Sequence, residues 1–268
     1  MSSSPSKKRQ RFQYSLRTLL MLMLVTSLGL SGLAVLRERA RREARLSATR
    51  NAFRSVFISL SNYDESYGHL PCAVRRETVG RETETGMPNG TGRPLYSWRG
   101  EISRFLCWGC IVEDLSQPWD SPINKDVRIG PYCYDALDHK RGQVSSETNM
   151  LAICGPGTAF GCDGRPPQSM KSLGRNTILI AEVRRSGIHW MEPGDFDIRD
   201  MLHTINAADG RGISSRYPGG FHVVFSDGEV WFLSEKIPFE TLARFFTIAE
   251  ANNCDREAVL GEFVLWRL

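Results

Sequence analysis

The sequence predicts an α+β protein in which a long N-terminal helix packs on an antiparallel sheet and a C-terminal helix follows. Residues 18–67 begin as an apolar run and continue with apolar residues at helical spacing. From residue 149 onward, apolar residues alternate or run over five to eight positions between Gly, Pro, Asn and Asp, as in strands. Residues 238–253 then return to the spacing of an amphipathic helix.

The amino-acid composition limits the classes of protein to which the chain can belong. The chain has 268 residues, of which 41% are hydrophobic, so it can bury a sizeable core. Residues 1–54 hold twelve Lys or Arg and two Glu, which leaves 22 basic and 28 acidic residues in the rest of the chain. The basic residues flank an apolar segment and do not cover a folded face, so we expect no nucleic-acid partner.

The apolar segment, TLLMLMLVTSLGLSGLAVL at residues 18–36, predicts a transmembrane helix. At 1.5 Å per residue a helix of this length spans roughly 28 Å, about the thickness of a bilayer's hydrocarbon core. Basic residues lie on both sides of it, so local counting does not fix the orientation. We favour a cytoplasmic leader at residues 1–17, because a long C-terminal domain is translocated largely regardless of such charges.

This reading gives a single-pass protein of the inner (cytoplasmic) membrane, with an extracytoplasmic domain over residues 68–268. A cleaved signal peptide is the alternative. It is disfavoured because the apolar run is longer than usual and LRERARREARL follows where a small-residue cleavage site would stand.

Residues 37–67 are expected to continue the helix outside the membrane. An apolar stripe recurs there at spacings of three, four and seven, beneath an Arg-rich face. The stripe consists of Leu46, Phe53, Val56, Phe57 and Leu60. We expect the helix to end near Tyr67, because Gly68 is a typical terminator and Pro71 blocks resumption.

Seven cysteines favour an exported protein, although the number is odd. Cys107 and Cys110 form a Cys-Trp-Gly-Cys pair, and Cys154 and Cys162 bracket a glycine-rich stretch. Structural disulfides or idle thiols are the favoured interpretation of these four residues. A zinc site lacks a second close pair of ligands, and thiol redox chemistry at Cys107 and Cys110 stays open.

The strands are expected in TNMLAIC, NTILIAEV, GFHVVFSD and GEVWFLSE. Asp227 and Gly228 lie between the last two, and Asp-Gly tolerates the positive φ angles of a tight hairpin. Val224 and Val230 then become cross-strand partners. Gly219 and Gly220 would also allow a neighbouring subunit to approach closely, but turn chemistry and core packing are the favoured explanation of this motif.

An acidic stretch supplies the candidate metal ligands. Glu192, Asp195, Asp197 and Asp200 lie close together, and carboxylates suit a hard cation such as calcium. The calcium loop pattern is absent, so a solvated loop capping a short helix is favoured; if a metal binds, Asp195 and Asp197 are its expected ligands. No nucleophile elbow, phosphate loop or histidine motif occurs, and we expect no enzyme activity.

Five segments of the sequence follow one another in the same order as the corresponding segments of a known family. They are NAFRSVFISLSNYDESYGHLP, QPWDSPINK, TNMLAICGPGTAF, NTILIAEVRRSGIHWMEPGDFD and YPGGFHVVFSDGEVWFLSE. Together they resemble the prepilin-like bacterial family catalogued as domain of unknown function fifteen-fifty-nine, over nearly the whole chain. The resemblance implies a pilin-like helix, half in the membrane and half packed on an antiparallel sheet outside the cytoplasm, as in pseudopilins of type II secretion or type IV pilus systems.

Three positions depart from the family's pattern. Gln13 stands where the processing peptidase needs Gly, and Thr18 where a Glu would pair with a neighbouring N-terminal amine. Tyr217 replaces the His of the family's signature of His, nine residues, then Asp-Gly. We therefore expect a retained leader and impaired assembly into filaments by the usual route.

The sequence thus predicts a membrane-anchored, pseudopilin-like structural or interaction protein of a secretion-like or envelope apparatus. Its expected partners are the inner membrane and other envelope or pilin-like proteins. The alternative is a membrane-tethered extracytoplasmic module that binds a cation or an envelope ligand. A tethered thiol oxidoreductase is the least favoured class.

Overall fold

The computed structural model describes six ranges of the chain: residues 15–77, 92–106, 114–125, 146–160, 168–207 and 212–267. The chain divides into two compact units, residues 1–45 and residues 46–268. Helix α1 (Leu16–Tyr67) contributes residues to both units.

Helix α1 begins and ends where local signals place its termini. Ser15 caps the start, because its Oγ accepts a hydrogen bond from the Thr18 amide at 3.3 Å. At the other end Gly68 has a φ of +79° and donates from its amide to the Asp64 carbonyl at 2.7 Å. The predicted end at Tyr67 is therefore confirmed.

A six-stranded sheet forms the centre of the second unit, in the order β5-β3-β4-β6-β7-β8. Its strands are β3 (Met150–Cys154), β4 (Ile178–Glu182), β5 (Phe196–Asp197), β6 (Gly220–Phe225), β7 (Val230–Ser234) and β8 (Val264–Arg267). A separate antiparallel pair consists of β1 (Val74–Arg76) and β2 (Pro94–Ser97).

The sheet is mixed, which corrects the expectation of an antiparallel one. Strand β5 runs parallel to β3, with Ile153 opposite Phe196 and Cys154 opposite Asp197. The other neighbours in the sheet are antiparallel. Strand β4 ends with Glu182 opposite Met150, at the start of β3, and Phe196 and Asp197 then advance along β3 in its own direction.

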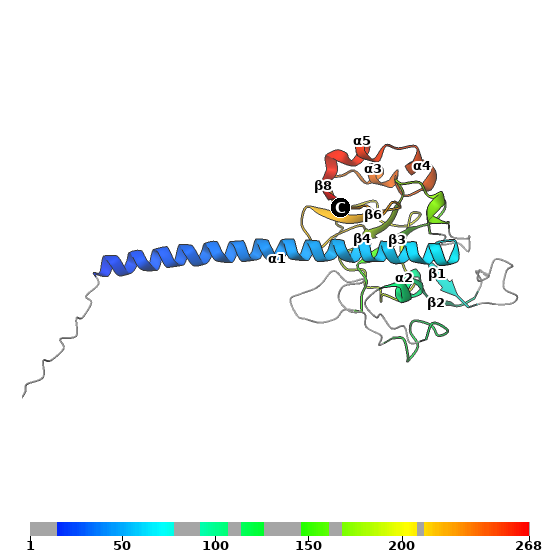
Figure 1. Cartoon of the computed structure of the whole chain (residues 1–268), viewed down its shortest axis with the longest axis horizontal. Coiled ribbons are helices and arrows are strands. Elements are labelled where there is room, and N and C mark those ends of the chain that lie inside the picture. The colour runs from blue at the N-terminus through cyan, green and yellow to red at the C-terminus, as the bar shows by residue number, and fades with distance from the viewer. Residues whose placement is uncertain are drawn as a thin grey trace, which may run out of the picture. The chain divides into compact units, whose positions relative to one another are not determined.

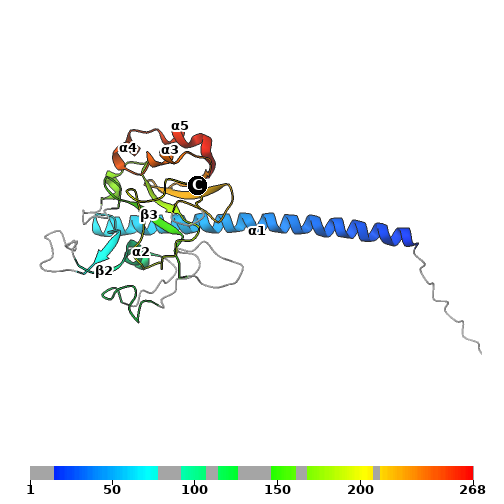
Figure 2. The same cartoon turned by 180° about the vertical axis from the view of Figure 1, so that it is seen from behind.

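Each face of the sheet carries its own apolar core, and Figures 1 and 2 show the helices that accompany the sheet. On one face, residues 46–67 of α1 and the short helix α2 (Trp98–Ile102) cover side chains such as Ala152, Ile180 and Val224. On the other face, α3 (Phe239–Ala243), α4 (Ile248–Asn252) and α5 (Arg256–Leu260) cover Ile153, Val223 and Trp231. Short 3-10 turns lie at Ser103–Phe105, Met170–Ser172 and Gly261–Phe263.

The single C-terminal helix expected over residues 238–253 is broken into α3 and α4, and α5 follows them. The carbonyl of Phe245 accepts from the Ile178 amide of β4 at 2.8 Å, so it leaves the helical pattern. Thr247 then caps α4, because its side chain accepts from the Glu250 amide. A tertiary hydrogen bond thus overrides the local helical spacing.

The predicted hairpin is confirmed between β6 and β7. Val224 lies opposite Val230, and Gly228 in the turn has a φ of +90°. Both strands lie inside the sheet and not at its edge. Trp231 is accordingly fully buried and Phe232 nearly so, and both contribute to core packing within the domain.

Candidate functional site

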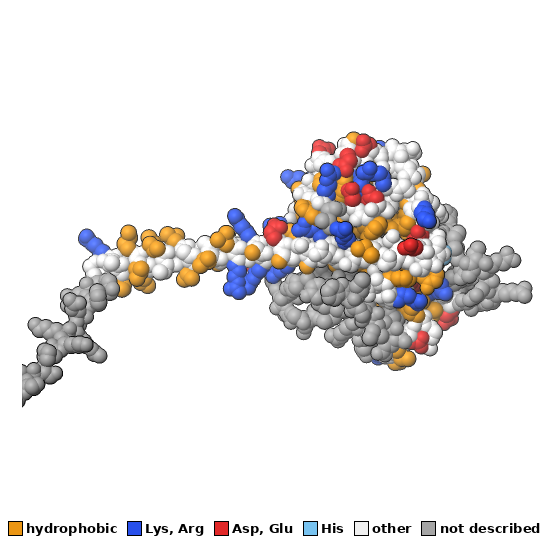
Figure 3. Space-filling view, in the orientation of Figure 1, with side chains coloured by type: hydrophobic (Ala, Val, Ile, Leu, Met, Phe, Trp, Pro, Cys, Tyr) orange, Lys and Arg blue, Asp and Glu red, His pale blue; other side chains and the backbone are white. Residues whose placement is uncertain are grey.

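The first half of α1 exposes its apolar side chains. The large hydrophobic residues between Leu16 and Leu36 are exposed, and Figure 3 shows them on several sides of the helix. The hydroxyls in this stretch bond back to the helix: Thr26 donates to the Leu22 carbonyl at 2.9 Å and Ser31 to the Ser27 carbonyl at 2.8 Å. Helix α1 is long and apolar enough to cross a membrane by length and composition.

The second half of α1 docks on the sheet through a buried polar cluster, which we call the docking cluster: Thr49, Glu182, Ser215, Tyr217 and His222. The carboxylate of Glu182 accepts from the Ser215 hydroxyl at 2.8 Å and from the His222 amide at 3.0 Å. Its Oε2 also lies 2.6 Å from Nδ1 of His222, and neither side chain is exposed. Burial of this pair is compensated by these hydrogen bonds.

Two members of the docking cluster reach α1. The hydroxyl of Tyr217 lies 3.0 Å from Oγ1 of Thr49, in a buried hydrogen bond. The ring of His222 stacks on Phe53 at a centroid distance of 5.6 Å and packs against Phe232 at 4.7 Å. Tyr217 and His222 therefore both contact the second half of α1.

The docking cluster is not arranged as a catalytic triad. Glu182 lies between Ser215 and His222, so the serine hydroxyl donates to a carboxylate and the imidazole contacts the other oxygen of that carboxylate. Nε2 of His222 is buried and has no hydrogen-bond partner in the described part of the chain. The cluster can position α1, and its geometry does not activate a nucleophile.

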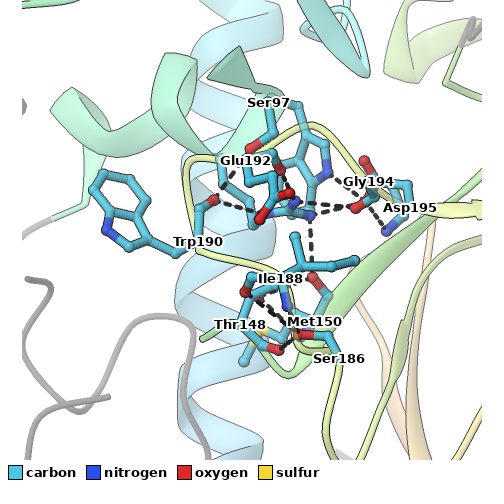
Figure 4. Close-up of polar contacts among 12 residues, drawn as sticks. Ser97, Thr148, Met150, Ser186, Ile188, Trp190, Glu192, Gly194 and Asp195 are labelled. Atoms are coloured by element: carbon cyan, nitrogen blue, oxygen red, sulfur yellow. Dashed lines mark hydrogen bonds and ion pairs between the residues drawn. The ribbon is translucent and has the colours of Figure 1, made fainter. Parts of the chain in front are cut away.

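A second buried cluster is centred on Arg99 and holds the loop that leads into β5; Figure 4 labels the loop residues Trp190, Glu192, Gly194 and Asp195. The guanidinium donates to the carbonyls of Trp190, Glu192 and Gly194 at 2.8, 2.9 and 3.1 Å. It also pairs with Asp195 at 2.8 Å, and both side chains are almost fully buried. Arg99 thus fixes residues 190–195 by a fork of donors that a lysine could not reproduce.

The two expected metal ligands are held by arginines. Oδ1 of Asp195 accepts from Trp98 Nε1, from Arg99 and from the Ala152 amide, while burial raises the pKa of Asp195 against the opposing effect of Arg99. Hydrogen bonds from Arg199 lower the pKa of Asp197. Across the six described ranges, no group of three or more His, Cys, Asp or Glu is placed to hold a metal.

The short helix expected after Asp197 is a turn in the structure. Asp197 belongs to β5 and accepts from the Arg199 amide at 3.0 Å, which closes the turn locally.

A third buried carboxylate belongs to Glu101 of α2, which contacts Tyr63 near the C-terminal end of α1. The Tyr63 hydroxyl donates to it at 2.6 Å, and Arg75 lies 3.6 Å away. Burial raises the pKa of Glu101, in opposition to these partners. Burial and the charge of Glu101 raise the pKa of the Cys72 thiol to about 11, which disfavours its thiolate.

Three of the four residues of the expected turn or contact motif have partners inside the domain. A Cβ on Gly220 would lie 2.4 Å from the Leu233 carbonyl oxygen, and one on Gly228 would lie 2.5 Å from the Phe57 ring. Asp227 pairs with the buried Arg256 at 2.8 Å. Gly219 has a φ of +96° and open space around it, so its conformation explains the glycine.

Cys154 is disulfide-bonded, whereas Cys72 and Cys254 are free thiols. The other cysteines considered for disulfides, Cys107, Cys110 and Cys162, lie outside the described residues.

Sequence reasoning did not single out Arg99, Glu182 or His222. Glu182 and His222 could have been recognised from the sequence, because each is a polar residue within a run of apolar strand residues that are buried in the structure. Arg99 could not have been recognised from its neighbours in the sequence, since its hydrogen-bond partners lie more than 50 residues away along the chain.

Comparison with known proteins gives no relative: no family model matches the chain, and no curated protein or solved structure matches it.

Proposed function

We propose that this protein is a membrane-anchored, pilin-like structural or interaction protein, with its α+β domain on the extracytoplasmic side of the inner membrane. One observation carries the proposal: α1 combines an exposed apolar half with a half that is built into the core of the domain. An apolar helix with no polar face is stable in hydrocarbon and unfavourable in water.

The hydroxyl groups of the apolar half support an environment without water. Thr26 and Ser31 donate to carbonyls one turn earlier, so neither needs a solvent partner. The disulfide at Cys154 supports an extracytoplasmic domain, because disulfides persist in oxidising compartments.

A scaffolding role is supported by the use that the fold makes of its polar residues. Glu182 and His222 join β4 and β6 beneath α1, and Arg99 fixes the loop before β5. These groups hold elements of the domain in place. A role in a secretion-like or envelope apparatus follows from the resemblance to prepilin-like proteins.

A second candidate is a tethered module that binds an envelope ligand without assembling into filaments. Thr18 favours it, because the position carries no charge and its hydroxyl lies 2.8 Å from Ser15 Oγ at the helix start. The intermolecular charge pairing of filament assembly is then missing from this position.

The decisive experiment combines topology with processing. Full-length protein is extracted from membranes with alkaline carbonate, and matched C-terminal fusions to alkaline phosphatase and to green fluorescent protein report the side of the domain. We expect the protein to resist extraction by carbonate, the phosphatase fusion to be active and the green fluorescent protein fusion not to fluoresce. A carbonate-soluble protein or a fluorescent fusion would refute the proposal.

The mass of the mature protein separates the two candidates. An intact leader favours the tether, whereas cleavage after Gln13 favours assembly. In-cell crosslinking from an exposed residue such as Arg244 then identifies what the domain contacts.

A further inference from the structure

We propose that the arginines that follow the apolar half of α1 bind the phosphate groups of anionic phospholipids where the helix leaves the bilayer. We call this segment, residues 37–45, the basic collar. It contains Arg37, Arg39, Arg41, Arg42 and Arg45. The inference rests on the proposed membrane anchor and adds a defined partner to it.

The first argument is position. Arg37 follows directly on Leu36, the last residue of the apolar run. With a rise of 1.5 Å per residue, the collar extends about 12 Å along the helix axis. The headgroup layer of one leaflet is roughly 5–7 Å thick, and charges are screened over about 8 Å at physiological salt. Every arginine of the collar therefore lies within reach of lipid phosphates.

The second argument is charge. Five arginines and two glutamates give the collar a net charge of +3. Arg41 lies 3.9 Å from Glu38 in a highly exposed pair, which contributes little to stability and does not remove the arginine from solvent. Guanidinium groups are preferred partners of phosphate because they present two parallel donors.

The third argument is distribution around the helix. At 100° per residue, Arg37, Arg41 and Arg45 lie on one side while Arg42 and Arg39 extend the charge over about 200° of the circumference. Figure 3 shows Lys and Arg side chains on more than one side of this part of α1. A helix that emerges from a bilayer is surrounded by headgroups, whereas a protein or nucleic-acid partner would contact one face.

The basic collar also explains an otherwise unfavourable feature. Positive residues beside a transmembrane helix bias that side toward the cytoplasm, so an exported collar opposes the preferred orientation. Attraction to an anionic membrane surface gives these arginines a favourable interaction on the exported side.

The test uses full-length protein in dodecyl maltoside micelles that contain equal amounts of phosphatidylglycerol and phosphatidylcholine. Native mass spectrometry measures the ratio of the two lipids retained. We expect the wild type to retain more phosphatidylglycerol than phosphatidylcholine. In the triple variant Arg37→Gln, Arg39→Gln, Arg41→Gln, the ratio of phosphatidylglycerol to phosphatidylcholine should be about tenfold lower than in the wild type.

A matched control removes three positive charges from exposed positions of the second unit: Lys171→Gln, Arg185→Gln, Arg244→Gln. It should keep the wild-type preference. An equal loss in both variants would show a general charge effect and overturn the inference, as would a wild type with no lipid preference. Loss of the preference in excess inorganic phosphate at matched ionic strength would also overturn it, because the collar would then be an ordinary anion site.

Carbonate extraction of the same proteins separates this inference from the proposed function. If the wild type is not an integral membrane protein, the anchor itself is wrong. If wild type and variant are both integral but retain the same lipids, only the basic collar is wrong.

Discussion

The two halves of α1 have the same backbone structure and opposite relations to their surroundings. In the first half, leucines such as Leu24 and Leu28 are 57% and 66% exposed. In the second half, Phe53, Val56 and Leu60 are completely buried against the sheet. The difference lies in periodicity: apolar residues occupy all sides of the first half and one stripe of the second. The pattern therefore indicates which surroundings each half needs.

The second half of α1 is held by more than apolar contact. Thr49 bonds Tyr217, Phe57 packs on the turn at Gly228, and Tyr63 donates to Glu101. Substitutions in the two halves should therefore affect different properties: membrane integration for the first and stability of the domain for the second.

The largest expected effect is loss of membrane integration. Replacing Leu24 and Leu28 together by Arg places two charges near the centre of the apolar half and disfavours insertion by about 6 kcal/mol. We expect the variant to leave the carbonate-resistant fraction. Ile58→Arg, on the exposed side of the second half, is the control and should stay integrated. Integration of the double variant would mean that residues 18–36 are not the span.

The next effect concerns core packing. Phe53→Ala should lower the free energy of unfolding of the domain by about 3–5 kcal/mol, because it removes a fully buried ring. Leu33→Ala, in the exposed half, should change it by less than about 0.5 kcal/mol. Urea unfolding of full-length protein in detergent, followed by tryptophan fluorescence, measures both. Equal losses would contradict the contrast between the halves.

The turn at Gly228 offers a smaller effect. Gly228→Ala combines a strained positive φ with a close contact to Phe57 and should destabilise the domain by about 1–3 kcal/mol. Gly219→Ala carries similar strain in open space, so the difference between the two variants isolates the contact with α1. Phe57→Ala should rescue part of the loss in Gly228→Ala. The absence of rescue would show that strain alone explains the effect.

The hydroxyl of Tyr217 should contribute less. Tyr217→Phe removes the hydroxyl that lies 3.0 Å from Thr49 and should cost about 1 kcal/mol. A double-mutant cycle with Thr49→Val, measured by urea unfolding, should show coupling between the two residues. Additive losses would mean that the hydrogen bond does not help to fix α1.

The smallest effect concerns Glu101 and the way in which the free energy of unfolding depends on pH. Burial raises its pKa in the folded protein above the ordinary value of 4.5, so between these two values the unfolded chain is ionised and the folded domain is protonated. The contribution of Glu101 to stability is therefore full below 4.5 and is lost as the pH rises through the raised pKa. Glu101→Gln should remove this part of the slope in urea unfolding between pH 4 and pH 8. Identical slopes would show that Glu101 stays ionised beside Arg75 and Tyr63.

Local signals predicted a large part of the fold. Gly68 ends α1, and Asp227 with Gly228 sets the register that places Val224 opposite Val230. These features depend on neighbouring residues along the chain, so a window of a few positions contains the needed information. The break between α3 and α4 does not, because the Phe245 carbonyl is captured by an amide of β4.

The candidate site shows the same division. The sequence indicated Asp195 as a candidate metal ligand because it lies in an acidic stretch. In the structure its hydrogen-bond partners Trp98, Arg99 and Ala152 come from α2 and β3. A sequence window around Asp195 contains none of them. The pairing of Glu182 with His222 is equally hidden, since the two residues are 40 positions apart.

The sequence by itself determined an apolar helix without a polar face, a basic collar after it and the hairpin of β6 and β7, because hydrophobic periodicity and turn chemistry act over short distances. Only the tertiary structure decided the parallel strand β5, the broken C-terminal helix and the buried clusters around Arg99 and His222. A buried charge is tolerated only where distant elements supply its hydrogen bonds, and the positions of those elements are set by the packed sheet.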